Sequence, residues 1–280
     1  MDKKWTTIIK PKTGWFDVNL KEVIQYRDLI FLFVKRNFAV EYKQTILGPL
    51  WFVINPLLTT IISTLVFGGI AGIETDGVPY FLFYLTGYTI WNYFSICISQ
   101  TSNTFATNAA IFGKVYFPRL TMPIATVIYS LVKMGIIFFM TLIGMLIYWM
   151  RGTVIQPNLH MLLIPVFIVQ TAILGLGFGI IISSLTTKYR DLTIVVGFGI
   201  QLWMYITPVV YPASKMSGLL GTLIWLNPVT PLVNNFRYAL LGSGWFEWRY
   251  WGISVLTSFV VLCIGVMIFS RVEKTFMDTI

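Results

Sequence analysis

The sequence predicts an all-α integral membrane protein with six transmembrane helices. We also expect an interfacial amphipathic helix on the cytoplasmic side before the first span, and re-entrant or interfacial short helices on the outer face before the last. Hydrophobic residues make up 56% of the 280 residues and charged residues only 11%, whereas about a quarter of a soluble domain is charged. Six continuous apolar runs are long enough to cross a bilayer, and basic residues gather at their ends. Continuous apolar runs favour helices over barrel strands, which are shorter and alternate.

Residues 1–48 are predicted to be a cytoplasmic segment, because they lack the apolar core and cleavage site of a signal peptide. From residue 27 onward, a helix at 100° per residue has one apolar stripe and a basic side. The stripe holds Phe31, Val34, Phe38 and Tyr42. Arg36 and Lys43 lie opposite, and Gly48-Pro49 should break the helix before the first span. Such a helix can rest among lipid headgroups, although an ordinary core helix has the same periodicity.

Each of the six runs has roughly the 20 residues that a membrane-spanning helix needs. They cover residues 49–72, 79–100, 121–150, 159–185, 192–210 and 250–270. The loops that hold Lys114, Arg119 and Lys188 fall on the same side as the basic N-terminal segment and the 271–280 tail. The positive-inside rule therefore predicts that both termini are cytoplasmic and that residues 49–270 form the transmembrane domain.

Two connections are longer than turns. Cytoplasmic residues 101–122 should contain a short helix near 108–112 at the inner membrane face. Outer residues 211–248 hold two apolar runs, 219–226 and 229–241, which are too short to cross and are punctuated by prolines. We expect them to line or cap the outer end of a pathway, since irregular backbone at membrane depth needs protein or water to satisfy it. An external loop with an apolar underside is the alternative.

Residues that could carry catalysis are few. His160 is the only histidine, and it is more readily explained as an interfacial side chain than as a base or metal ligand. Gly113-Lys114 does not belong to a phosphate-binding loop, because Asn108 and Val115 replace its first glycine and its Ser or Thr. We therefore expect no catalytic residue, no metal and no ATP bound by this chain through such a loop. The net charge of +9 follows membrane topology, so no nucleic-acid partner is expected.

Lys133 is a cation about twelve residues into the third apolar run, roughly 18 Å deep at the rise of a helix. It either faces a hydrated path where it meets an anionic substrate, or reaches back toward the cytoplasm. Aromatic side chains in the spans are the other signal, since they can stack on sugars. Packing and interfacial anchoring are the commoner roles of such rings. The aromatic candidates for lining a path are Tyr84, Tyr88, Trp91, Trp203 and Tyr205.

Four segments occur in the order seen in a known family. They are VEYKQTILGPLWFVINPL at 40–58, FGKVYFPRLTMP at 112–123, a glycine-rich run into KYRDL that ends at residue 192, and NPVTPLVNNFRYALLG at 227–242. With them, the chain resembles the permease subunit of type-2 ABC exporters of polysaccharides, the family of O-antigen, capsule and teichoic-acid export. It is most similar to the O-antigen type.

The resemblance implies a homodimer that works with two copies of a separate cytoplasmic ABC ATPase, on which ATP and magnesium bind. It assigns ATPase coupling to Asn108, Phe112, Gly113, Lys114, Tyr116 and Arg119. It assigns contacts of the interfacial helix with the ATPase or a lipid diphosphate to Arg36, Tyr42 and Lys43. It assigns an outer gate to Asn227, Pro228, Pro231, Asn234 and Arg237, and a pair that holds two spans in register to Arg190 and Asp191.

The function expected from these features is export of a lipid-linked, O-antigen-like polysaccharide across the bacterial inner membrane, through a channel between two copies. Two alternatives stay open. One is an exporter of drugs or small lipids with the same fold. The other is a membrane enzyme acting on lipid-linked sugars, for which Glu74, Asp76, Glu247 and His160 are the outer candidates.

Overall fold

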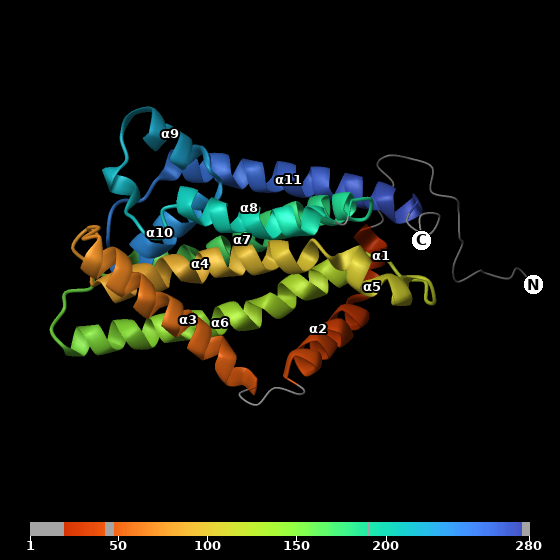
Figure 1. The fold of residues 1–280 in the computed structure, drawn as a ribbon, viewed down its shortest axis with the longest axis horizontal. Helices are drawn as coiled ribbons and strands as arrows, with labels where there is room; N and C mark the ends of the chain where they lie inside the picture. Colours follow the sequence, from red (N-terminus) through yellow and green to blue (C-terminus); the bar gives the residue numbers. More distant parts are fainter. Residues whose placement is uncertain (1–19, 43–47, 190, 276–280) are drawn as a thin grey trace, which may run out of the picture.

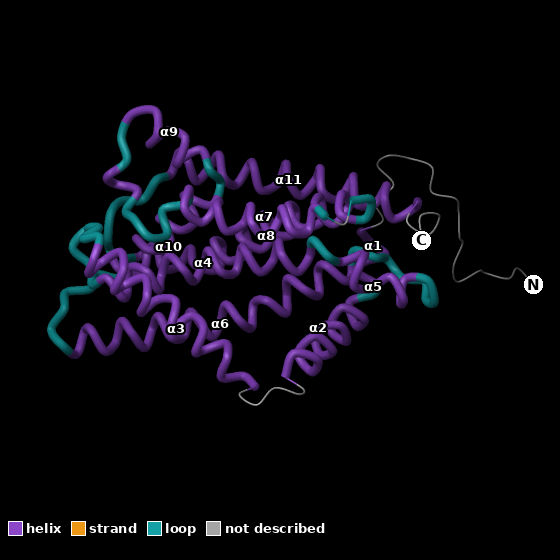
Figure 2. Tube along the Cα trace, in the orientation of Figure 1, coloured by secondary structure: helices purple, strands orange, loops and turns teal. Residues whose placement is uncertain are grey.

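The computed structural model describes residues 20–42, 48–189 and 191–275 (Figure 1). Every regular element in these ranges is a helix, and loops or turns join them (Figure 2). Lys43 and Arg190 lie outside the described residues, and for Tyr42 only the backbone is described. The predicted all-helical class is therefore confirmed for the described part of the chain.

Helices occur at each predicted apolar run. The first half of the chain contains α1 (Leu20–Gln25), α2 (Arg27–Tyr42), η1 (Gly48–Leu50), α3 (Trp51–Ser63), the π-helical η2 (Thr64–Ile70), α4 (Tyr80–Thr101), α5 (Thr104–Phe112) and α6 (Thr121–Met150). The second half contains η3 (Leu159–Leu163), α7 (Ile164–Thr186), α8 (Leu192–Ile206), η4 (Ala213–Lys215), α9 (Gly218–Leu226), α10 (Val229–Leu241) and α11 (Trp248–Thr275). The helix α2 is described as far as Tyr42, and Gly48, where a break is expected, begins η1 with a φ of 46° in the left-handed region.

Among the described residues, four helical segments are long and apolar enough to cross a membrane by length and composition. They are Trp51–Ile70, Thr121–Met150, Leu159–Thr186 and Trp248–Glu273. The helix α8 is apolar but shorter. The helix α4 has 22 residues, and polar side chains such as Asn92 and Gln100 interrupt its apolar sequence.

The long helices run side by side in a bundle, with α4, α6, α7, α8 and α11 close to the long axis of the molecule (Figure 1). At one end lie α9, α10 and the loops before α4 and after α6. At the other end lie α1, α5 and the end of α11. The helix α2 packs obliquely on α6, and its C-terminal end lies near η1 at the start of α3.

Two hydrophobic cores hold the bundle together. The main core contains buried side chains of α4, α7 and α10, among them Phe94, Leu174 and Phe236. A second core, here called the α5-end core, contains Val23, Ile30, Phe33, Phe105, Phe112, Phe117, Leu120, Met122, Ala125, Ile180 and Phe269. This second core joins α1, α2, α5, α6, α7 and α11, so the small helices at this end are packed into the bundle.

Candidate functional site

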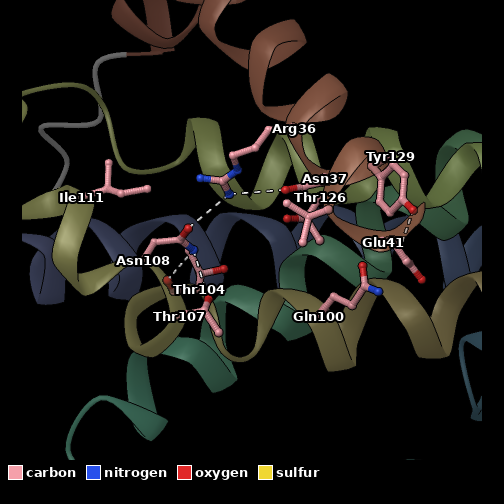
Figure 3. A pocket seen from close by; sticks show the side chains of 11 residues that line it. Arg36, Asn37, Glu41, Gln100, Thr104, Thr107, Asn108, Ile111, Thr126 and Tyr129 are labelled. Atoms are coloured by element: carbon pink, nitrogen blue, oxygen red, sulfur yellow. Dashed lines mark hydrogen bonds between the residues drawn. The ribbon is translucent and has the colours of Figure 1, made fainter. Parts of the chain in front are cut away.

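A polar cavity of about 560 Å³ lies between α2, the C-terminal end of α4, α5 and α6 (Figure 3). The helices leave this space where α2 crosses the bundle, and polar side chains face it. Its polar lining consists of Arg36, Asn37, Glu41, Gln100, Thr104, Thr107, Asn108, Thr126 and Tyr129. Amides, hydroxyls, one guanidinium and one carboxylate can bind a ligand that carries both charge and hydroxyl groups.

Arg36 projects from α2 toward α5 (Figure 3). Its Nη2 donates to Asn108 Oδ1 at 3.4 Å and to Asn37 Oδ1 at 3.3 Å, and its guanidinium lies 5.0 Å from the centre of the Phe33 ring. The Asn108 amide is itself oriented by donating to Thr104 O at 2.9 Å. Neutral amides hold the guanidinium, and no carboxylate among the described residues neutralises it. Its charge is available to an anion in the cavity.

Glu41 forms the other charged part of the lining. Lys133 Nζ lies 2.6 Å from Glu41 Oε1, and the Tyr129 hydroxyl donates to Glu41 Oε2 at 2.5 Å. The ammonium of Lys133 also lies 5.0 Å from the centre of the Phe52 ring. Lys133 is 7% exposed, so this pair connects the middle of α6 to α2. The sequence left two interpretations of Lys133 open, a contact with an anionic substrate or a reach toward the cytoplasm, and neither included an acidic partner on α2. The need of a buried lysine for a counter-charge was the signal that could have identified Glu41.

The predicted coupling element comprises α5 and the turn that follows it. Phe105 and Phe112 anchor the helix in the α5-end core, where Phe112 lies 5.7 Å from Phe117 between ring centres. The turn beyond Phe112 is exposed from Gly113 to Tyr116. Here this four-residue segment is called the coupling tip. A rigid base with an exposed apolar and basic tip is suited to docking on another protein.

Two contacts tie the coupling element to the ends of the chain. The Tyr116 hydroxyl donates to Glu22 Oε1 on α1 at 3.2 Å. Arg119 donates from its backbone nitrogen to Glu273 Oε1 at 3.2 Å and from its guanidinium to the Glu273 carbonyl on α11. Partial burial lowers the pKa of Arg119, and the nearby Glu273 opposes that shift. Of the six predicted coupling residues, Arg119 therefore contacts α11, Asn108 faces the cavity, and Phe112 is an anchor.

A family model that matches most of the chain identifies the family. The model of the ABC-2 type transporter matches residues 28–241, which run from α2 to the end of α10. The chain belongs to the ABC-2 type transporter family.

Curated relatives of this ABC-2 transporter include two proteins from Klebsiella pneumoniae and one from Myxococcus xanthus, each named O-antigen export system permease protein RfbA. One K. pneumoniae protein is 28% identical over 252 residues, which cover 90% of this chain and 94% of the relative. The M. xanthus protein is 27% identical over 220 residues, which cover 78% of this chain and 82% of the relative. The sequence resemblance to ABC export permeases is thereby confirmed.

At the opposite end of this ABC-2 transporter, Arg237 of α10 is buried. Its guanidinium lies 3.6 Å from the centre of the Phe83 ring, and it donates to Pro208 O at 3.2 Å and to Val209 O at 3.0 Å. The helix α4 passes close by at Gly87, where a Cβ atom would lie 2.3 Å from Arg237 Nη2. One side chain therefore connects α10, α4 and the turn after α8. The sequence interpretation missed Gly87, which only the close approach identifies.

The other predicted gate residues also connect α10 to its neighbours. Asn227 accepts from Trp203 Nε1 at 3.1 Å and donates to Thr207 Oγ1 at 2.9 Å. The Pro228 carbonyl accepts from Ser254 Oγ on α11 at 2.5 Å, and Pro231 is buried in the first turn of α10. Asn234 donates to Trp245 O at 2.9 Å. These contacts fix α10 in place, and its gating role stays a prediction.

The five aromatic candidates for a path differ in exposure. Tyr84 and Trp91 are buried in the main core, and Trp203 packs edge-on against Phe94 at 5.2 Å between ring centres. Tyr88 is half-buried and accepts from the Asn92 amide at 3.0 Å, and Tyr205 is 50% exposed. Packing within one chain accounts for the first three rings, so Tyr88 and Tyr205 are the better placed to contact a substrate. A lining role stays a prediction for all five.

The outer titratable side chains do not converge on one point. The His160 ring stacks on Phe246 at 4.6 Å between centres. Glu74 pairs with Lys215 at 2.6 Å, and Asp76 Oδ1 accepts from Ser214 Oγ at 2.8 Å. Within residues 20–42, 48–189 and 191–275, no three His, Cys, Asp or Glu side chains are grouped to hold a metal ion.

Proposed function

We propose that this chain is the permease subunit of an ATP-driven exporter of a lipid-linked, O-antigen-like polysaccharide. Two copies enclose the path, six helices of each cross the bacterial inner membrane, and both termini are cytoplasmic. Two copies of a separate ATPase subunit bind ATP and magnesium, so this chain carries no cofactor. The family match supports a permease, and the names of the relatives support the cargo.

The observation that carries this proposal is the position of the polar cavity. It lies between α2, which packs along the side of the bundle, and α5, the predicted contact with the ATPase. A lipid-linked glycan has an acyl part, a phosphate part and a sugar part, and α2 offers a different surface to each. Phe31 and Phe38 are exposed on α2 and suit lipid chains, whereas Arg36 faces the cavity and suits phosphate.

The proposed mechanism uses the packing of the coupling element. Closure of the ATPases on ATP pushes the coupling tip, and α5 moves with it. The Phe33–Phe117 contact at 5.6 Å and the Arg36–Asn108 hydrogen bond pass this movement to α2. The cavity wall therefore shifts with the ATPase cycle, which changes access to the path. The polymer then moves between the two copies toward the periplasm, past Tyr88 and Tyr205.

Co-purification and ATP hydrolysis test the proposal together. The chain is produced with its ATPase, and residues 113–119 are replaced with a flexible Gly/Ser linker of equal length. We expect the wild-type pair to co-purify and its ATP hydrolysis to rise when lipid-linked glycan is added in nanodiscs. The linker variant should enter the membrane and lose the ATPase. Co-purification of the linker variant at the wild-type yield would refute the coupling assignment.

The same assay separates the rival functions. An exporter of drugs or small lipids would hydrolyse ATP faster with those compounds and not with lipid-linked glycan. A membrane enzyme would modify the glycan without ATP, and alanine at Glu74, Asp76, Glu247 or His160 would stop it. We expect these four alanine variants to export at the wild-type rate, because the four side chains lie apart from the cavity.

A further inference from the structure

The cavity between α2 and α6 has two chemically different ends. Arg36 and Asn108 lie at one end, and Glu41, Gln100 and Tyr129 at the other (Figure 3). One end carries a guanidinium that attracts an anion, and the other carries a carboxylate whose charge is balanced by Lys133 and which accepts hydrogen bonds. A ligand with a charged part and a neutral hydroxylated part therefore has one favoured orientation.

The carboxylate of Glu41 is held in place and still partly accessible. Lys133 contacts one of its oxygens and Tyr129 the other. An ionised carboxylate has roughly four lone-pair sites, so about two are left for further donors. The Glu41 side chain is 38% exposed and lines the cavity. A fixed, half-accessible carboxylate is a strong acceptor for hydroxyl groups, because hydrogen bonds to charged acceptors are roughly twice as strong as neutral ones.

Gln100 adds a second polar group to the Glu41 end. Its amide makes no hydrogen bond with another described residue, and its side chain points toward the space below Glu41 (Figure 3). An amide offers both donors and an acceptor, as a sugar hydroxyl requires. The Tyr129 ring beside them is buried, and its hydroxyl donates to Glu41 and helps to fix the carboxylate.

We propose that the cavity binds a sugar phosphate in one orientation, with the phosphate on Arg36 and the hydroxyls of the sugar on Glu41 and Gln100. This inference rests on the proposed function and assigns the first sugar of the lipid-linked glycan to a site on this chain. Glu41 is then a specificity residue: it favours a diphosphate that bears a sugar over a bare diphosphate. Sites that hydrogen-bond a substrate hydroxyl discriminate strongly against the analogue that lacks it.

The test compares two probes on the permease–ATPase complex in nanodiscs. One probe is a short isoprenyl diphosphate, and the other is the same diphosphate bearing a single hexose. We expect Glu41→Gln to weaken binding of the hexose-bearing probe about tenfold, since a charged acceptor is replaced by a neutral one. Binding of the bare probe should stay the same or tighten. Arg36→Gln should weaken both probes, and Asp28→Asn, which removes an exposed acid from the same helix, should change neither.

Gln100→Leu gives a second measurement that does not disturb the Glu41–Lys133 pair. We expect it to weaken only the hexose-bearing probe. The inference would be overturned if Glu41→Gln weakened binding of both probes equally and Gln100→Leu weakened neither. The role of Glu41 would then be to hold α2 against α6. If wild-type complex binds neither probe but full-length lipid-linked glycan stimulates its ATP hydrolysis, this site is refuted and the proposed function stands. If the glycan does not stimulate hydrolysis, the proposed function fails.

Discussion

Substitution of Gly87 by alanine should loosen the attachment of α10 to α4. The added Cβ would lie 2.3 Å from Arg237 Nη2 and 3.0 Å from the Val209 carbonyl, so the guanidinium has to move. Nη2 makes two of the three hydrogen bonds from Arg237, one each to the carbonyls of Pro208 and Val209. Because Arg237 is 2% exposed, water does not replace these bonds.

The expected cost follows from those two hydrogen bonds. Each hydrogen bond from a charged donor contributes about 1.5–3 kcal/mol, and alanine regains about 1 kcal/mol over glycine in a helix. Allowing for partial rearrangement, we expect Gly87→Ala to lower the free energy of unfolding by about 2–4 kcal/mol. That corresponds to a fall in Tm of roughly 5–15 °C for a chain of this size.

Thermal unfolding of the purified protein in detergent, followed by tryptophan fluorescence, measures this effect. Gly135→Ala on α6 is the matched control, because a Cβ there meets nothing within 4 Å. Arg237→Met should lower the free energy of unfolding less in the Gly87→Ala variant than in the wild-type protein, because the clash has already broken the hydrogen bonds of Nη2. Equal Tm values for Gly87→Ala and Gly135→Ala would refute the argument that Arg237 fixes α10.

Three further predictions concern the ion pair, the helix crossing and the coupling tip. Lys133→Met should lower the free energy of unfolding by about 1–3 kcal/mol in the same thermal assay. The double variant with Glu41→Gln should lose less free energy of unfolding than the two single variants together, because the pair is already broken in each. Strictly additive losses would argue against the pair. Gly265→Ala places a Cβ 2.7 Å from a backbone carbonyl of α7 and should lower the free energy of unfolding by about 1–3 kcal/mol. Gly252→Ala on the same helix is the control and should leave it unchanged. Equal Tm values for the two variants would contradict this packing. Tyr116→Ala should lower the yield of co-purified ATPase several-fold with little change in Tm, because the side chain is 65% exposed; an unchanged yield would remove Tyr116 from the docking surface.

The helices of this fold could be predicted because a continuous apolar run has only one satisfactory backbone conformation in a bilayer. The run predicted at 121–150 coincides with α6, Thr121–Met150. The short helix expected near 108–112 is the last part of α5, and the two outer apolar runs are α9 and α10. Prolines and glycines marked these boundaries, so local chemistry was sufficient.

The candidate site could be predicted only in part. Periodicity placed Arg36 on the polar side of α2, but it gives the faces of one helix and not the neighbour that each face meets. The pairing of Glu41 with Lys133 depends on the angle at which α2 crosses α6, and the role of Gly87 depends on where Arg237 of α10 lies. Both are long-range contacts that follow from packing of whole helices.

The division into two cores bears on how such an exporter alternates its access. Rings of Phe33, Phe112 and Phe117 join α2 to the coupling element in the α5-end core, so movement of the tip moves the wall of the cavity. Arg237 and Phe236 of α10 belong to the packing at the far end, around α4 and α8. Packed cores shift between discrete arrangements more readily than they deform continuously. Because different cores support the cavity and the α10 end, the proposed export mechanism allows the cavity wall to move with the coupling tip while the packing around Arg237 is kept.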